Sequence, residues 1–113
     1  MSHEALQPRQ FGNYITRPKG YNNIVAEHAN SGRSVGYLSW LSGDKTSANP
    51  RPIAGEADPT KPVIYKTVVS SRSRRKGIAT AMLDHARAIA PDLQHAGPQA
   101  LTEDGAAFAK ARP

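Results

Sequence analysis

The chain has 113 residues, of which 38% are apolar, and its lysines and arginines outnumber its acidic residues to give a formal net charge of +6. It is long enough for one small domain with one core, and the absence of cysteine excludes a disulfide framework, a thiolate metal site and a cysteine nucleophile. The positive charge favours anionic partners such as a phosphorylated cofactor or nucleic acid.

No apolar run approaches the length of a membrane span, and the N-terminus lacks the charged and then apolar pattern of a secretory signal. The sequence therefore predicts a cytoplasmic protein with no membrane partner. Residues 1–10 are polar and predict a flexible tail, and residues 11–16 predict a short first strand. The residue types of 23–29 and 34–41 favour two strands. The intervening Asn30-Ser31-Gly32-Arg33 is a turn sequence, so these two strands should form an antiparallel hairpin.

This hairpin has two features of functional interest. Gly36, inside the second strand, predicts a bulge or a close approach of two backbones. Glu27 and His28 are adjacent and should point to opposite faces of the sheet, so that one of them could face a cleft, although a solvated side chain is the commoner case. After the hairpin, residues 43–62 contain four prolines and no periodicity, which predicts a long irregular loop insertion, with a lid over a binding site as the alternative.

The most informative stretch is a strand, a basic loop and a helix. Residues 63–69 are β-branched and aromatic and predict a strand, and residues 70–76 then carry four cations before Gly77. Helical spacing over residues 77–90 predicts one broad buried face, made of Ile78, Ala79, Met82, Leu83, Ala86, Ile89 and Ala90. A helix N-terminus presents unpaired N–H groups and partial positive charge, so this arrangement is suited to binding a diphosphate.

The end of the chain predicts two further elements. Residues 93–96 favour a short strand, which Gly97-Pro98 ends. Residues 102–111 favour a second helix, whose buried stripe should consist of Leu101, Ala107, Phe108 and Ala111.

One sequence motif connects these elements with a known family. Arg74-Arg75-Lys76-Gly77-Ile78-Ala79 matches the pattern R/Q-x-x-G-x-G/A, and with the strand before it and the helix after it the chain resembles the GNAT N-acetyltransferase superfamily. The resemblance implies an α/β (α+β) fold of the acyl-CoA N-acyltransferase type, with a mixed, mostly antiparallel sheet and a central pyrophosphate-loop helix. Residues 1–113 would form a single small domain of this kind.

The resemblance also implies a cofactor and an activity. The family transfers an acetyl group from acetyl-CoA to an amine, which here could belong to a small molecule or to a protein. Val68 and Val69 would offer backbone groups to the pantetheine arm. The pyrophosphate would lie against Arg74, Arg75, Lys76, Gly77, Ile78, Ala79 and Thr80. Gly77 should matter most, because a Cβ there would push the phosphates away, and Gly77→Val should weaken binding with little effect on the fold.

The acid and base of the reaction are harder to assign. Many family members use a glutamate on the fourth strand and a tyrosine on the last helix, but this chain has Tyr65 and Lys66 on that strand and Phe108 on that helix. The remaining candidates are His95, Tyr65 and His28, and His95 is the first of them because it would lie near the thioester and histidine titrates near neutral pH. A structural bond from His95 to a backbone carbonyl is the alternative. The scattered histidines predict no metal site.

The resemblance covers residues 22–111 without the long loop, and it represents the cofactor half better than the acceptor half. A pair of helices between the first two strands is missing, and two final strands of the family are not found in the chain, which would leave a sheet edge and favours a homodimer. Two alternatives to an enzyme stay open. One is a non-catalytic CoA-binding domain, and the other is a basic nucleic-acid-binding module, supported by the cluster at residues 72–76 but not by interleaved aromatic residues.

Overall fold

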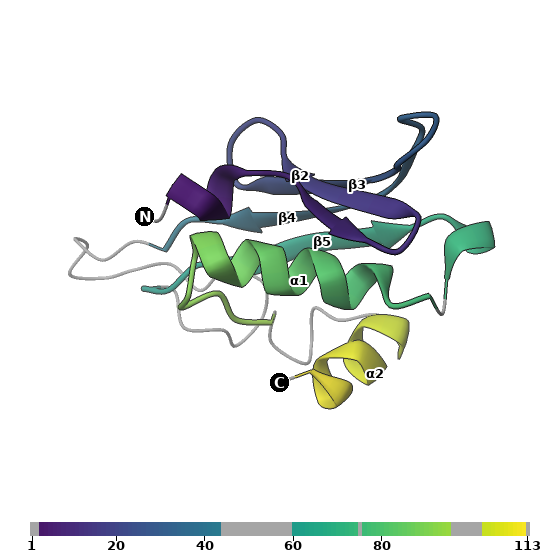
Figure 1. The fold of residues 1–113 in the computed structure, drawn as a ribbon. Coiled ribbons are helices and arrows are strands. Elements are labelled where there is room, and N and C mark those ends of the chain that lie inside the picture. Colours follow the sequence, from purple (N-terminus) through teal and green to yellow (C-terminus); the bar gives the residue numbers. More distant parts are fainter. Residues whose placement is uncertain (1–2, 44–59, 75, 96–102, 113) are drawn as a thin grey trace.

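The computed structural model describes residues 3–43, 60–74, 76–95 and 103–112, and Figure 1 shows one long helix lying across a single sheet. The sheet has five strands in the order β1-β2-β3-β4-β5, and each strand is antiparallel to its neighbour. These strands are β1 (Arg9–Phe11), β2 (Tyr14–Pro18), β3 (Asn23–His28), β4 (Ser34–Leu41) and β5 (Val63–Val69). The helices are α1 (Ile78–Ile89) and α2 (Glu103–Ala111).

The core lies between α1 and one face of the sheet. The helix buries a face made of Ile78, Met82, Leu83, His85 and Ala86, as the helical spacing of its apolar residues predicts. Opposite it, alternate residues of the central strands are buried because a pleated strand turns every second side chain to the same face, and these are Tyr14, Ile24, Ala26, Leu38, Trp40 and Ile64. This packing fixes the position of the start of α1 relative to the end of β5.

The predicted hairpin is confirmed, and so is the role of its glycine. β3 and β4 pair antiparallel, and the register shifts between Ala26 and Glu27, opposite Val35, which is a β-bulge. A Cβ added to Gly36 would lie 2.5 Å from the carbonyl oxygen of Val68, so β4 and β5 approach too closely there for any side chain. The pairing of β4 with the edge strand β5 therefore depends on this one glycine.

The N-terminal prediction is wrong. His3–Leu6 form a 3-10 helix, η1, and Ala5 is buried, so the described part of residues 1–10 is not a loose tail. The predicted strand over residues 11–16 is a hairpin, in which β1 ends at Phe11 and β2 begins at Tyr14. The turn between them needs Gly12, whose φ of 56° lies in the left-handed region that glycine adopts without strain. The hydrophobic pattern alone did not reveal this turn.

Two predictions at the C-terminal end also need correction. In the described part of the expected strand at residues 93–96, there is only one parallel bridge, between Val63 and Gln94. Leu93 is bonded to the end of α1 instead, through its N–H and the carbonyl of Ala90. The helix α2 is confirmed, and Phe108 packs against the core, but Ala107 and Ala111 are exposed. Leu101, the break at residues 97–98 and most of the predicted loop at 43–62 lie outside the described residues.

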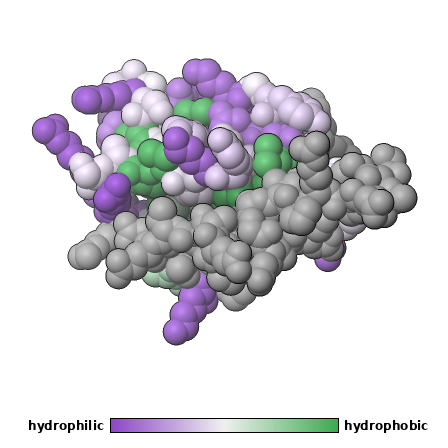
Figure 2. All heavy atoms as spheres, turned by 180° about the vertical axis from the view of Figure 1, so that it is seen from behind, coloured by the Kyte–Doolittle hydropathy of each residue, from purple (hydrophilic) through white to green (hydrophobic). Residues whose placement is uncertain are grey.

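The face of the sheet away from α1 is mixed in polarity. Figure 2 shows this side, where hydrophobic surface lies between strongly hydrophilic side chains. Arg17 of β2 and Glu27 of β3 form an ion pair here, with 2.7 Å between Nε and Oε1. Val25 beside them is buried. Glu27 therefore serves as a structural partner of an arginine on this face.

Candidate functional site

The site begins where β5 ends and α1 starts. After Val69 the chain makes a short 3-10 turn, η2 (Ser71–Ser73), and Gly77 then occupies the N-cap position of α1 with a φ of 76°. No side chain caps this helix, and its first turn holds no acidic residue. The N–H groups at the start of a helix lack partners within the helix and carry partial positive charge, so this end can accept an anion.

A cavity of about 240 Å³ lies over this helix start. It brings together the predicted residues Val69, Arg74, Gly77, Ile78, Ala79 and Thr80. Ser73 and Phe108 complete the lining, and the sequence analysis assigned neither of them to the site. Val68 and Lys76 do not line it, and Arg75 lies outside the described residues. The free N–H groups, the absence of acidic side chains and the arginine fit a pyrophosphate at this end of the cavity.

The backbone of Val69 faces this site. The N–H of Ser70 donates to the carbonyl of Val35 on β4 (2.7 Å), so the peptide groups of Val69, one residue earlier, point away from β4. In agreement, Nε of Arg74 donates to the carbonyl oxygen of Val69 at 3.2 Å. Arg74 therefore holds the basic turn against the end of β5, and the same residue lines the cavity.

Gly77 carries a structural constraint that the sequence did not reveal. A Cβ added to it would lie 3.0 Å from Cζ of Phe11 on β1, and the residue that carries it would have to adopt the left-handed φ of 76°. The missing Cβ thus faces the β1 strand, and the conformation itself disfavours any other residue. A valine at this position would strain the fold, contrary to the expectation that Gly77→Val leaves it intact.

The three candidates for acid and base are not part of the cavity lining, although His95 contacts Phe108, which is. The side chain of Tyr65 on β5 is 66% exposed, and the ring of His28 packs against Tyr14, with 5.1 Å between the ring centroids. His95 bonds through Nε2 to the backbone carbonyl of Arg112 and packs edge-on against Phe108. This is the structural bond that the sequence left open as the alternative for His95. None of the three side chains lines the cavity.

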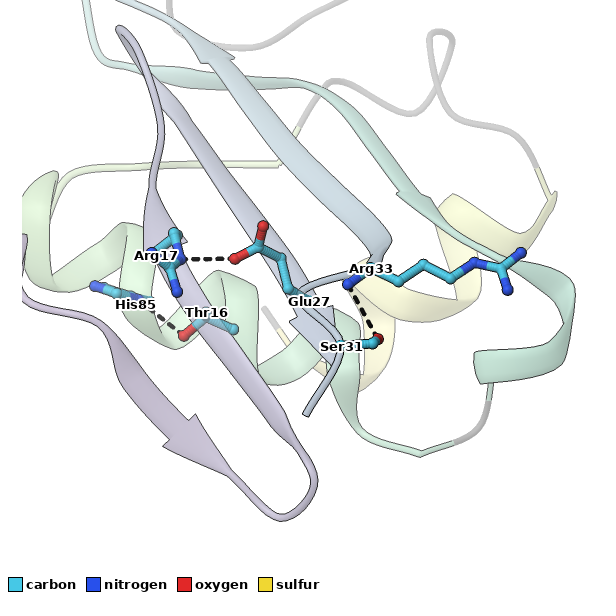
Figure 3. A network of polar contacts seen from close by, with 6 residues as sticks. All are labelled: Thr16, Arg17, Glu27, Ser31, Arg33 and His85. Carbon is cyan, nitrogen blue, oxygen red and sulfur yellow. Dashed lines mark hydrogen bonds and ion pairs between the residues drawn. The ribbon is translucent and has the colours of Figure 1, made fainter. Parts of the chain in front are cut away.

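Another histidine, His85 on α1, escaped the sequence analysis. It is fully buried, and its Nε2 donates to the carbonyl of Ala5 while its Nδ1 accepts from the hydroxyl of Thr16, both at 2.9 Å. Figure 3 shows the bond between Thr16 and His85. Burial lowers the pKa of His85, with the nearby charge of Arg9 acting in the same direction and the bond to Ala5 opposing it. Its position three residues after Met82, on the apolar face of the helix, was the available signal.

The comparison with known families agrees with this geometry. A model described as the acetyltransferase (GNAT) family matches residues 2–104. The chain belongs to this family. No curated protein and no solved structure gives a significant match. The GNAT match starts at residue 2 rather than at residue 22, so it includes the first hairpin, which the motif-based resemblance left out.

Membership in the GNAT family confirms the predicted fold class and gives an acetyltransferase-type function in general terms. Members of this family generally use acetyl-CoA or another acyl-CoA. Within the described ranges no helix is long and apolar enough to cross a membrane. The same ranges contain no group of three or more metal-ligating side chains placed to hold an ion.

Proposed function

We propose that the chain is an acetyl-CoA-dependent N-acetyltransferase that transfers an acetyl group to an amine. The observation that carries this proposal is the uncapped start of α1 at Gly77, which opens into a cavity that extends to the end of β5 at Val69. A site for a diphosphate and a strand end with outward backbone groups thus lie in one cavity. This combination suits a molecule with a pyrophosphate at one end and an amide-rich arm at the other.

The residues that would hold the cofactor follow from the lining of the cavity. The N–H groups of Ile78, Ala79 and Thr80 belong to the first turn of α1 and would donate to the pyrophosphate. Arg74 would add a positive charge that can bind in a bidentate manner. Lys76 and Arg75 would contribute attraction at longer range. Bound acetyl-CoA would supply the acetyl group as a thioester.

The chain must also handle charge and protons during transfer. An oxygen that becomes negative needs a backbone donor, and the N–H of Val69, which points away from β4, is suitably placed for this role. The acceptor amine must lose a proton, and His95, Tyr65 and His28 remain the proposed groups for this step. His95 would have to give up its bond to the carbonyl of Arg112 to take part.

The composition of the cavity lining favours a second candidate function. Because none of the three acid–base candidates lines the cavity, a CoA-binding domain without catalysis would need no change in the structure. Both functions include the binding of CoA, but only the enzyme consumes acetyl-CoA. A nucleic-acid-binding module has no comparable support from the described residues.

The test measures binding and turnover separately. Calorimetric titration with CoA should give binding in the micromolar range, and Arg74→Ala should weaken it by about 1.5–3 kcal/mol, the scale of a hydrogen bond to a charged group. Arg33→Ala removes the same charge from the exposed turn between β3 and β4 and serves as the matched control. Release of free thiol from acetyl-CoA over a panel of amines then separates the enzyme from the non-catalytic domain. Absence of binding at millimolar CoA would refute both.

A further inference from the structure

The face of the sheet away from α1 carries a small apolar strip close to the end of β5. The core residues of β4 alternate with residues that point to this other face, which are Tyr37 and Ser39. Tyr37 pairs with Val68 of β5, so their side chains lie side by side on this face, and both residues are half-buried. Val68 directly precedes Val69, which lines the cavity at the start of α1. The strip is therefore adjacent to the proposed cofactor site but on the other face of the sheet.

One exposed cation lies at each end of this strip. Lys66 lies two residues before Val68 on β5, and Arg33 directly precedes β4 in the turn from β3. Figure 3 shows the side chain of Arg33 extending away from Glu27. Both cations are exposed, and neither forms an ion pair with a described residue. Ser39, the strand partner of Lys66, follows Arg33 by six positions, so at about 3.3 Å per residue the two cations are about 20 Å apart along the strand.

The strands around the strip supply no free negative charge to offset these cations. Glu27 is the one acidic residue in the five strands, and its carboxylate is paired with Arg17 at 2.7 Å. The potential near Arg33 and Lys66 is therefore positive and attracts anionic groups. Nearby cations also favour the neutral form of an amine, which is the form that attacks a thioester. The charge of this face thus suits an acceptor amine that is surrounded by carboxylates.

We propose that this face binds acidic peptide segments that carry the acceptor lysine, with Arg33 and Lys66 on carboxylates to either side of it and Tyr37 against its aliphatic stem. This inference rests on the proposed function. The cavity is lined by Ile78 and Phe108 on the α1 side, so a bound cofactor leaves the opposite face of β5 to the acceptor. A separation of about 20 Å matches carboxylates about six residues apart in an extended peptide, three on each side of the lysine.

The test uses three peptides that differ only in charge. Each has blocked ends, one central lysine and, three positions before and after it, either glutamate, glutamine or arginine. Fluorescence anisotropy with the full chain saturated with CoA should give the glutamate peptide about three- to tenfold higher affinity than the glutamine peptide, the scale of two exposed ion pairs. The arginine peptide should bind more weakly than both. Added salt at about 0.5 M should reduce the preference, because it screens exposed charges.

Variants of the protein locate the contact on this face. Arg33→Gln and Lys66→Gln should each reduce the preference for the glutamate peptide, and the double variant should bring the ratio close to one. Lys19→Gln removes an exposed cation from the turn between β2 and β3, at the opposite end of β3, and serves as the matched control. The affinity for CoA should stay unchanged in all of these variants, because none of the three residues lines the cavity.

Thiol release from acetyl-CoA gives a second measurement, in which the glutamate peptide should react fastest. If the three peptides bind equally, or if the double variant keeps the preference, the acceptor assignment is wrong and the proposed function stands. Turnover of small amines without binding of any of the peptides would also overturn the assignment and leave the acetyltransferase activity intact. If CoA itself does not bind at millimolar concentration, the proposed function and this inference fail together.

Discussion

The substitution Thr16→Val tests the buried contact between β2 and α1. The hydroxyl of Thr16 donates to Nδ1 of His85, and the two residues are 2% and 0% exposed, so water cannot replace the lost donor. Leaving a buried nitrogen without a partner costs about 1–3 kcal/mol. The new methyl group is of similar size to the hydroxyl and returns up to about 0.8 kcal/mol through apolar burial. The expected loss of unfolding free energy is therefore about 1–2 kcal/mol.

Urea denaturation at pH 7.5, followed by the fluorescence of Trp40, measures this difference directly. Thr67→Val on β5 is the control, because Thr67 is only half-buried and forms no side-chain hydrogen bond with a described residue. Its unfolding free energy should change by less than about 0.5 kcal/mol. If Thr16→Val unfolds at the same urea concentration as wild type, the bond seen at 2.9 Å makes no net contribution and the reasoning about His85 is wrong.

Three further predictions concern pH and two glycines. Burial lowers the pKa of His85 from its ordinary value of 6.5. Below pH 6.5 the unfolded chain therefore binds a proton more readily than the folded chain does. The free energy of unfolding should be highest above pH 6.5 and should fall on acidification by at most about 1.4 kcal/mol per pH unit. Urea midpoints between pH 7.5 and 5 should show this slope in wild type and a flatter one in His85→Gln. Gly36→Ala places a Cβ 2.5 Å from the carbonyl of Val68, so overpacking should cost about 1–3 kcal/mol, and an unchanged midpoint would contradict the close approach of β4 and β5. Gly77→Ala should lower the unfolding free energy by about 1–2 kcal/mol because of its left-handed φ. It should cost more than Gly32→Ala, because Gly32 has a similar φ but no atom near its missing Cβ. Equal losses in thermal melts would show that the contact with Phe11 is unimportant.

The parts of the fold that could be predicted are those with a repeating pattern. Residues 78–89 have helical spacing and residues 63–69 are β-branched, so both α1 and β5 follow from local chemistry. The cavity at the start of α1 could be predicted for the same reason, since the turn at Gly77 joins these two elements directly along the chain. Local sequence decides local structure most strongly where the elements are neighbours.

The parts that could not be predicted depend on contacts between distant residues. The buried state of Ala5 follows from its bond to His85, which lies 80 positions later in the chain. Residues 93–96 have strand-like composition, yet among the described residues 93–95 only Gln94 pairs with β5. A cavity between β1 and α1 joins Arg9 with Arg112, and no sequence spacing relates two residues at opposite ends of the chain.

The bond between Ala5 and His85 has a consequence for the order of folding. The strands β1 to β4 pair only with their neighbours in the chain, so these hairpins can form early at a low cost in loop entropy. The turn at His3–Leu6 precedes them in sequence but has its partner on α1, so it can dock only when that helix has packed onto the sheet. The 3-10 turn should therefore become ordered after the hairpins do, although it is synthesised first.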